Sequence, residues 1–152
     1  MDEFIKLYRE VYKDLYKIAY YYMGNKTEAE DAVGDAVLRA YENFAHLKEK
    51  EAFRSWITKI LVNCCKKRMK IWYRKEEALE EKILYHEPDY ISKQAIHEAF
   101  TVLSKEERLI IALYVFGGYK GEEISQILQK NHNTIRSKYH RALGKLKKQL
   151  ES

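Results

Sequence analysis

The sequence contains few residues that break helices or cross-link chains: its 152 residues include one proline, six glycines and two cysteines. A single proline leaves few places where a helix must end, and no Asn-Gly turn between alternating apolar residues predicts a β-hairpin. Cys64 and Cys65 are adjacent in a helical stretch, a spacing that suits neither an ordinary disulfide nor a zinc site. We expect them to be buried as small apolar side chains or to remain free thiols.

Long apolar runs are also missing. No segment approaches the roughly 20 apolar residues of a membrane-spanning helix, and the N-terminal "MDEFIKLYRE" lacks the apolar centre of a signal peptide. We therefore expect no membrane insertion and a cytoplasmic location. The five histidines are scattered, and no HExxH motif, Gly-rich phosphate loop or nucleophile elbow is present. The sequence thus predicts no catalytic residues, no metal site and no cofactor.

The charged residues are distributed in blocks. Residues 51–75 hold 8 basic and 1 acidic side chains, and residues 119–152 hold 8 and 3. Between these blocks, residues 76–118 hold 4 basic and 9 acidic side chains. Two basic blocks separated by an acidic one are typical of a protein that contacts a polyanion at two places.

Apolar residues recur at helical spacing through most of the chain, which predicts an all-α protein. One stripe runs from Phe4 to Tyr22, and the capping-box pattern of Thr27 and Glu30 predicts that a second helix begins there. The third predicted helix starts near Phe53. We predict two small helical domains joined by a linker. Their bounds are residues 1–75 for the first domain, 76–94 for the acidic linker and 95–152 for the second domain.

The second domain has the outline of a helix-turn-helix. Ser104 and Glu107 form a capping box that opens "KEERLIIALYVF", and the glycine pair "GG" ends this helix. The short helix "GEEISQIL", the turn "QKNHN" and a longer basic helix follow. An apolar stripe from Ile135 to Leu150 leaves the basic side of the last helix outward. This arrangement favours duplex binding over a hairpin that only packs on its partner. The candidate DNA contacts are Thr134, Arg136, Ser137, Lys138, His140, Arg141 and Lys145.

The run "NCCKKRMKIWYRK" in the first domain mixes cations with aromatic residues. Cations can follow a phosphate backbone and aromatic rings can stack on unpaired bases. Trp72 and Tyr73 could equally be core residues at a helix end. The candidate contacts to unpaired nucleic acid are Asn63, Lys66, Lys67, Arg68, Lys70 and Trp72.

The polar face of the second predicted helix carries Asp31, Asp35, Leu38 and Glu42. The helix dipole accounts for carboxylates near the N-terminus, but it does not account for Leu38. An apolar residue within an acidic stripe is typical of a binding site for a basic, partly apolar protein.

In both halves the chain resembles the extracytoplasmic-function sigma factors of bacterial RNA polymerase, in the sigma-70 superfamily. "EAEDAVGDAVLRAYENF" is similar to the polymerase-binding helix of that family, and "FRSWITKILVNCCKKRMK" to its promoter-melting helix. The C-terminal segment from "LSKEERLIIALYVF" to "TIRSKYHRALGKLK" resembles the domain that reads the upstream promoter element. The resemblance implies a sigma factor that binds core RNA polymerase and directs promoter-specific transcription initiation.

The resemblance also implies partners and roles. The helix around Asn63 would capture unpaired bases of the minus-ten element, and the basic face of the last helix would read the minus-thirty-five element in the major groove. The partners would be core RNA polymerase and promoter DNA, as a duplex and as a melted strand. An anti-sigma factor is a further candidate partner. The residues that would bind polymerase are Asp31, Asp35, Leu38, Arg39 and Glu42.

The chain departs from the family pattern at several positions. The family usually has glutamine at the position of Gly34, a serine or threonine cap where Lys120 and Gly121 stand, and glycine followed by an apolar residue where Gln129 and Lys130 stand. Two other hypotheses about the function remain open. One is a dimeric helix-turn-helix regulator that acts without replacing the sigma subunit and uses its N-terminal half for oligomerisation or ligand sensing. The other is an RNA-binding protein, in which the cluster around Trp72 would dominate.

Overall fold

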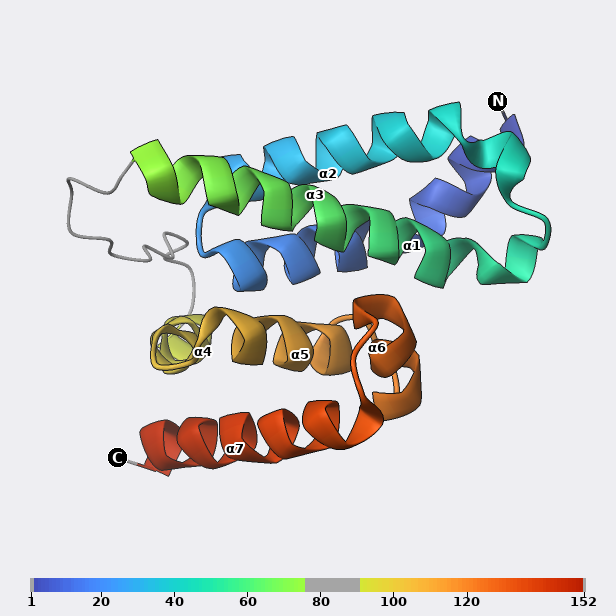
Figure 1. The fold of residues 1–152 in the computed structure, drawn as a ribbon. Helices are drawn as coiled ribbons and strands as arrows, with labels where there is room; N and C mark the ends of the chain where they lie inside the picture. Colours follow the sequence, from blue (N-terminus) through green and yellow to red (C-terminus); the bar gives the residue numbers. More distant parts are fainter. Residues whose placement is uncertain (1, 76–90, 152) are drawn as a thin grey trace.

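The computed structural model describes residues 2–75 and 91–151, and all regular structure within them is helical (Figure 1). This result confirms the predicted all-α fold class. The α-helices are α1 (Asp2–Met23), α2 (Lys26–Glu42), α3 (Phe53–Lys75), α4 (Ile91–Thr101), α5 (Lys105–Val115), α6 (Gly121–Leu128) and α7 (His132–Glu151), and two 3-10 turns, Phe44–His46 and Lys50–Ala52, precede α3.

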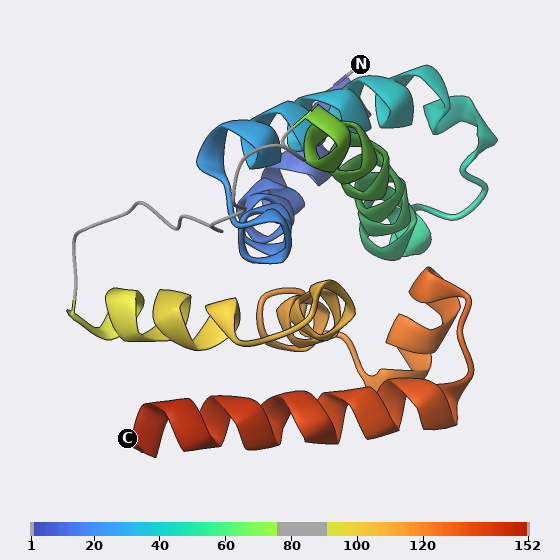
Figure 2. The same cartoon turned by 60° about the vertical axis from the view of Figure 1, so that its left-hand side comes forward.

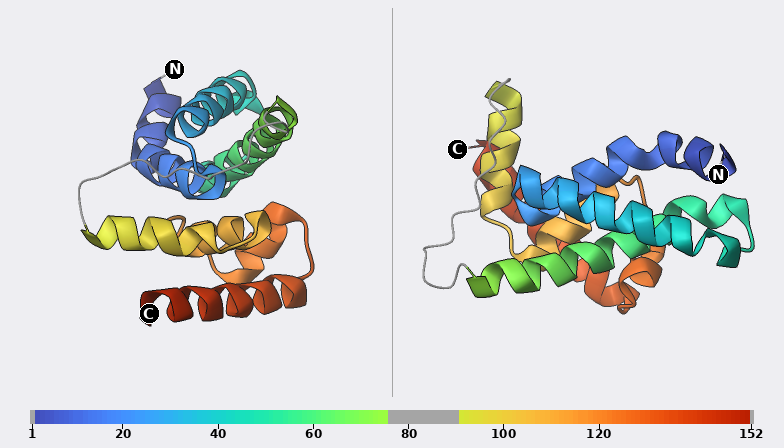
Figure 3. Two further views of the ribbon diagram at one scale, coloured as in Figure 1. Left: turned by 90° about the vertical axis from the view of Figure 1, so that its left-hand side faces the viewer. Right: turned by 90° about the horizontal axis from the view of Figure 1, so that it is seen from above.

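The helices form two lobes. We call α1–α3 the first lobe and α4–α7 the second lobe, and their interface the seam. Figures 2 and 3 show that α4, α5 and α6 lie against the first lobe and that α7 is the outermost layer of the second. Helix α4 begins at Ile91, within the predicted linker of residues 76–94. Residues 76–90 of that linker lie outside the described part of the chain.

The start of α2 corrects one prediction. Its N-cap is Asn25, which has an extended backbone (φ −145°, ψ 123°) and whose side-chain Oδ1 accepts the Glu28 N–H at 3.0 Å. The predicted capping box of Thr27 and Glu30 is therefore wrong, because asparagine is a stronger N-cap and stands two residues earlier. The preceding residue, Gly24, ends α1 with a positive φ of 73°, as its position after the first apolar stripe predicts.

The predicted capping box of α5 is confirmed. The Glu107 N–H donates to Ser104 Oγ at 3.2 Å, and the Ser104 N–H donates to Glu107 Oε1 at 2.9 Å. Helix α5 then ends at Val115, and Gly118 supplies the left-handed residue of the following turn with a φ of 69°. These contacts satisfy amide groups that a helix terminus otherwise leaves unpaired.

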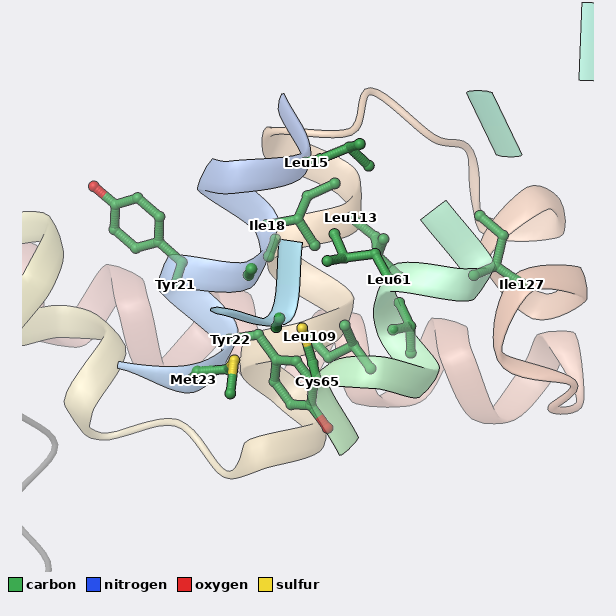
Figure 4. Packing of buried hydrophobic residues seen from close by; sticks show 14 of the residues in the cluster. Leu15, Ile18, Tyr21, Tyr22, Met23, Leu61, Cys65, Leu109, Leu113 and Ile127 are labelled. Carbon is green, nitrogen blue, oxygen red and sulfur yellow. The ribbon is translucent and has the colours of Figure 1, made fainter. Parts of the chain in front are cut away.

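The hydrophobic core is continuous across the seam. Leu15 and Ile18 of α1 are each 1% exposed, and they meet Leu61 of α3 together with Leu109 and Leu113 of α5 (Figure 4). The last turn of α1, from Tyr20 to Met23, is buried as well. An amphipathic helix at a surface buries one stripe, whereas α1 is covered on several sides at its end because both lobes pack on it.

Polar side chains also join the lobes. The Arg108 guanidinium of α5 is 2% exposed, and its Nε donates to the carbonyl oxygen of Tyr22 at the end of α1 at 3.0 Å. The hydroxyls of Thr58 on α3 and Tyr119 after α5 lie 2.8 Å apart in the interior. Such buried polar contacts need specific partners, so they favour one relative placement of the lobes.

Both cysteines are buried, as expected from their helical context, and neither is in a disulfide. Burial raises the pKa of the Cys64 thiol and of the Cys65 thiol. The thiolate is the reactive form, so these residues are packing groups rather than nucleophiles at neutral pH. None of the described helices combines the length and the apolar character that crossing a bilayer requires.

Candidate protein and nucleic-acid interfaces

The outer face of α2 is presented to solvent. The helix packs on its neighbours through alanines, including Ala32, Ala36 and Ala40, each 0% exposed, whose small side chains allow close approach. Leu38 on the opposite face is 63% exposed. The other predicted polymerase contacts, Asp31, Asp35, Arg39 and Glu42, are exposed on the same helix. The fold therefore presents an apolar side chain within a charged surface.

A groove between α2 and α3 brings two of the predicted sites together. It has a volume of about 370 Å³, and its walls include Asp35, Leu38 and Glu42 from α2 and Lys67 from α3. Ile71 of α3 also lines this groove and is 48% exposed, a residue that the sequence analysis missed. Its apolar character within a basic run was the available indication. We call this feature the α2–α3 groove.

Arg68 links the two walls of the α2–α3 groove. Its guanidinium donates to Glu28 Oε2 at 3.2 Å, to Asp31 Oδ2 at 3.1 Å and to Asp35 Oδ2 at 3.0 Å. Burial works to lower the pKa of Arg68, but the hydrogen bonds and charges of Asp35 and Glu28 outweigh it and raise the pKa. Arg68, which we predicted to contact DNA, is thus directed at the acidic face of α2.

Replacing Arg68 with glutamine should lower the free energy of unfolding by about 1–2 kcal/mol at low salt. Three carboxylates would lose a shared counter-ion, and each partly exposed pair contributes a fraction of 1 kcal/mol. Urea unfolding should detect the loss, which should shrink in about 0.5 M salt because exposed charges are screened. Lys67→Gln is the matched control, since Lys67 makes no ion pair with a described residue. Equal losses in the two variants would show that the carboxylate cluster has no special role.

The rest of the basic face of α3 points to solvent. Asn63, Lys66, Lys67 and Lys70 are all exposed. The side chain of Trp72 lies outside the described part of the structure, so its predicted base stacking stays a prediction. Three lysines and an asparagine on one exposed helical surface can contact phosphates and unpaired bases together.

Helix α7 is held on α5 and α6 by its apolar stripe. Ile135 and Ala142 are 0% exposed, and the ring of Tyr139 stacks on that of Tyr114 with centroids 3.8 Å apart and an interplanar angle of 27°. The opposite face lies on the outside of the second lobe (Figure 2). The exposed residues on α7 include five predicted DNA contacts: Thr134, Arg136, Ser137, His140 and Arg141.

Two other predicted DNA contacts are paired with acidic residues of α5. Lys138 forms an ion pair with Glu106, and Lys145 Nζ lies 2.7 Å from Glu107 Oε1. Burial works to raise the pKa of Glu107, but hydrogen bonds from Lys145 and the Ser104 backbone outweigh it and lower the pKa. These lysines therefore bind α7 to α5, and any phosphate contact by them competes with that pairing.

The departures from the family pattern around α6 have local solutions. The backbone N–H of Lys120 donates to Glu123 Oε1 at 2.9 Å, so half of a capping box forms without a capping hydroxyl. At the other end of α6, Gln129 takes the left-handed conformation (φ 52°, ψ 48°), and the Lys130 N–H bonds to the Ser125 carbonyl at 3.1 Å. The turn geometry thus forms although a side chain occupies the position that usually holds glycine.

Gln129→Gly should raise the free energy of unfolding by about 0.5–1 kcal/mol. A side chain in the left-handed region costs roughly 1–2 kcal/mol, from which the greater freedom of glycine in the unfolded chain subtracts about 0.5–1 kcal/mol. Thermal and urea unfolding can measure this gain. Gly118→Ala is the reverse control: Gly118 has a φ of 69°, so alanine there should destabilise the protein. A destabilised Gln129→Gly variant would mean that the glutamine side chain contributes contacts that offset its strain.

Comparisons with known proteins agree with this geometry. Residues 7–75 match the protein family Sigma-70 region 2, and residues 93–146 match the family Sigma-70, region 4. The RNA polymerase sigma factor SigV of Bacillus subtilis (strain 168) is 30% identical over 142 residues, which cover 91% of this chain and 85% of that protein. The ECF RNA polymerase sigma factor SigW of the same strain is 27% identical over 160 residues, covering 93% and 86%.

A solved structure shares the fold across both lobes. The sigma factor RpoE, in a co-crystal structure with the anti-sigma factor NepR from Bartonella quintana, matches with a TM-score of 0.87 and 22% sequence identity. The match covers 99% of this chain and 98% of that one. The similarity therefore includes the way in which the two lobes pack, as well as the fold of each.

Sigma-70 region 2 and region 4 follow each other in this order on the chain, one in each lobe. This pair of regions defines a transcription initiation factor with two separate binding lobes. The chain belongs to the extracytoplasmic-function sigma factors of the sigma-70 family. It binds core RNA polymerase and promoter DNA and directs promoter-specific transcription initiation. The comparisons do not favour the dimeric regulator.

Proposed function

We propose that the outer face of α2 is the surface that binds core polymerase, through Asp31, Asp35, Leu38, Arg39 and Glu42. The observation that carries this assignment is Leu38, which is 63% exposed in the middle of a charged face and lies on the α2–α3 groove opposite Ile71. Apolar area excluded from water supplies affinity, while the surrounding charges select the partner and its orientation.

The two other exposed surfaces are proposed to contact the promoter. The outer face of α7, with Arg136, Ser137, His140 and Arg141, reads the minus-thirty-five element in the major groove, where arginine can bond guanine in a bidentate manner. The exposed face of α3 captures unpaired bases of the minus-ten element. Its proposed contacts are Asn63, Lys66, Lys67, Lys70 and Trp72.

The distance between the two promoter elements bears on the placement of the lobes. Elements centred about 25 base pairs apart lie roughly 85 Å apart along the duplex axis. A folded chain of this size has a radius of gyration of about 15 Å. We therefore propose that the lobes separate when the protein engages the promoter, and that the closed arrangement is a resting form. The shared packing in the anti-sigma complex of RpoE supports an anti-sigma factor as a further partner.

The protein is proposed to act in the cytoplasm and to catalyse no reaction itself. Its contribution is binding: it brings polymerase to a promoter and holds the opened strand. This proposal fits a chain whose exposed candidate sites are mainly charged and polar side chains, with Leu38 and Ile71 as apolar members, and whose two thiols are buried.

Site-specific photo-crosslinking can test the three surfaces in one complex. A benzophenone amino acid would replace Leu38, Asn63 or Ser137, with Leu150 as a control that is 58% exposed at the end of α7. In a complex of core polymerase and promoter DNA, position 38 should crosslink polymerase, position 63 the melted strand and position 137 the upstream duplex. A chain that elutes alone as a stable dimer in gel filtration, with no crosslink from position 38, would overturn the assignment.

A further inference from the structure

A pocket of about 600 Å³ lies at the seam. The first lobe contributes residues of α1 and α2 to its walls, and the second lobe contributes Ile96 and His97 of α4 together with Phe116. Its volume is within the range of small-molecule sites, which often form at domain interfaces. None of the described residues assigned above to polymerase or DNA lines this pocket.

Four tyrosines of α1 form a ladder in the pocket. Tyr8, Tyr12, Tyr16 and Tyr20 recur every four residues and so lie along one helical face. Tyr12 is 42% exposed and Tyr20 is 4% exposed, so the ladder runs from the mouth of the pocket into the interior. The rings of Tyr16 and Tyr20 are nearly parallel, at 3°, with centroids 6.1 Å apart. Such a row of rings offers flat faces on which an aromatic ligand can stack.

The second lobe closes the inner end of the pocket. His97 is 5% exposed, its ring lies edge-on to Tyr20 with centroids 5.5 Å apart, and its Nε2 is 3.1 Å from the Tyr21 hydroxyl. Phe116 stacks on Tyr21 with centroids 4.5 Å apart. The enclosed part of the pocket therefore exists only while the lobes are packed together.

The rim of the pocket is positively charged. Lys13 and Lys17 are exposed one helical turn apart beside the tyrosine ladder, and neither forms an ion pair with a described residue. Glu30 is the one carboxylate among the described residues of the lining. Two unpaired ammonium groups next to an apolar aromatic surface match a ligand that has a flat apolar body and a negative charge.

We propose that this pocket binds an aromatic carboxylate, with its ring on the tyrosine ladder and its carboxylate between Lys13 and Lys17. Because both lobes form the walls, the ligand binds the closed arrangement and stabilises it by linkage. On the proposed function, in which promoter engagement separates the lobes, the ligand would oppose polymerase and promoter binding. The pocket itself does not depend on that function.

An NMR titration of the full chain with 2-naphthoate tests the site. Amide shifts should change along residues 12–20 and at residues 96, 97 and 116, and the neutral analogue 2-naphthalenemethanol should bind more weakly. Lys13→Glu combined with Lys17→Glu should weaken 2-naphthoate binding about tenfold or more. This change corresponds to a loss of about 1.4 kcal/mol or more of binding free energy. The same charge change at Lys6 and Lys48, which are exposed outside the pocket, should leave binding unchanged.

Several outcomes would overturn the site: no saturable shifts with 2-naphthoate, equal binding of the neutral analogue, or binding that survives reversal of Lys13 and Lys17. Ile96→Trp gives an independent check, because Ile96 is 38% exposed and a larger ring there should fill the mouth and reduce binding. Retained affinity in this variant, folded by circular dichroism, would also contradict the proposal.

A competition assay tests the regulatory part separately. With 2-naphthoate at about 100 times its dissociation constant, the apparent affinity for core polymerase should fall by up to about 100-fold if the open form excludes the ligand. If the titration shows the expected site but polymerase affinity does not change, the regulatory part is wrong and the site stands. If the site fails while the benzophenone at position 38 still crosslinks polymerase, the pocket proposal fails and the proposed function stands.

Discussion

Leu38→Asp should weaken binding to core polymerase by roughly 100-fold or more while the protein stays folded. Hot-spot residues near the centre of a protein interface cost about 2 kcal/mol or more when they are truncated, and we assign Leu38 to this group. The substitution removes this apolar area and places a new carboxylate in an acidic face that must be desolvated on binding. Leu38 is 63% exposed in the free protein, so the fold itself has little to lose. Affinity can be measured by fluorescence anisotropy of labelled protein titrated with core polymerase.

Leu150→Asp is the matched control for this experiment. Leu150 is 58% exposed, lies on α7 and falls outside the Sigma-70 region 4 match of residues 93–146. The Leu150→Asp variant should bind polymerase like the unmodified chain. Circular dichroism should show the same helicity for the Leu38→Asp and Leu150→Asp variants. Equal affinity in the Leu38 and Leu150 variants would remove α2 from the polymerase interface.

Arg136→Ala and Arg141→Ala should each cost about 1–3 kcal/mol of promoter discrimination if the arginine makes a bidentate base contact. Both side chains are exposed on the outer face of α7, and Ile135 and Ala142 beside them hold the helix on the domain. The measurement is selection of promoters from a library randomised in the minus-thirty-five element, with holoenzyme assembled from each variant. Each substitution should erase the base preference at one or two positions and leave the others unchanged.

Lys148→Ala provides the comparison for a charge without base contact. Lys148 is exposed on the same helix, about two turns beyond Arg141. A phosphate contact there would weaken binding to all sequences alike, without changing the selected bases. If the two arginine variants also lose affinity uniformly, they contact the backbone and another part of α7 reads the sequence.

The local features of the fold could be predicted from the sequence because they depend on nearby residues. The capping box of Ser104 and Glu107 and the apolar stripe of α7 involve residues within a few turns of each other. The start of α2 was placed incorrectly because Asn25 and Thr27 are both capping residues, and the pattern alone did not weigh one against the other. Competing local preferences of this kind are decided by the backbone that the tertiary structure selects.

The contacts between distant segments could not be predicted. Arg68 belongs to a run of cations, and this pattern predicts a nucleic-acid contact. In the structure its partners are Glu28, Asp31 and Asp35, which are 33 to 40 positions away in the sequence. Arg108 is a residue type that rarely lies fully buried, so its place at the seam has no sequence pattern. The exposure of Leu38 was foreseen because the surrounding carboxylates mark that face as the polar one.

The continuous core at the seam also determines what happens while the chain is being made. Leu15 and Ile18 leave the ribosome with the first lobe, but Leu109 and Leu113, which cover them, are synthesised later. Translation at 5–20 residues per second takes about 2–8 s to pass from the end of α3 to the end of α5. During that interval the first lobe exists with an apolar side uncovered. Newly made protein is therefore most exposed to aggregation and to chaperone capture before its second half appears.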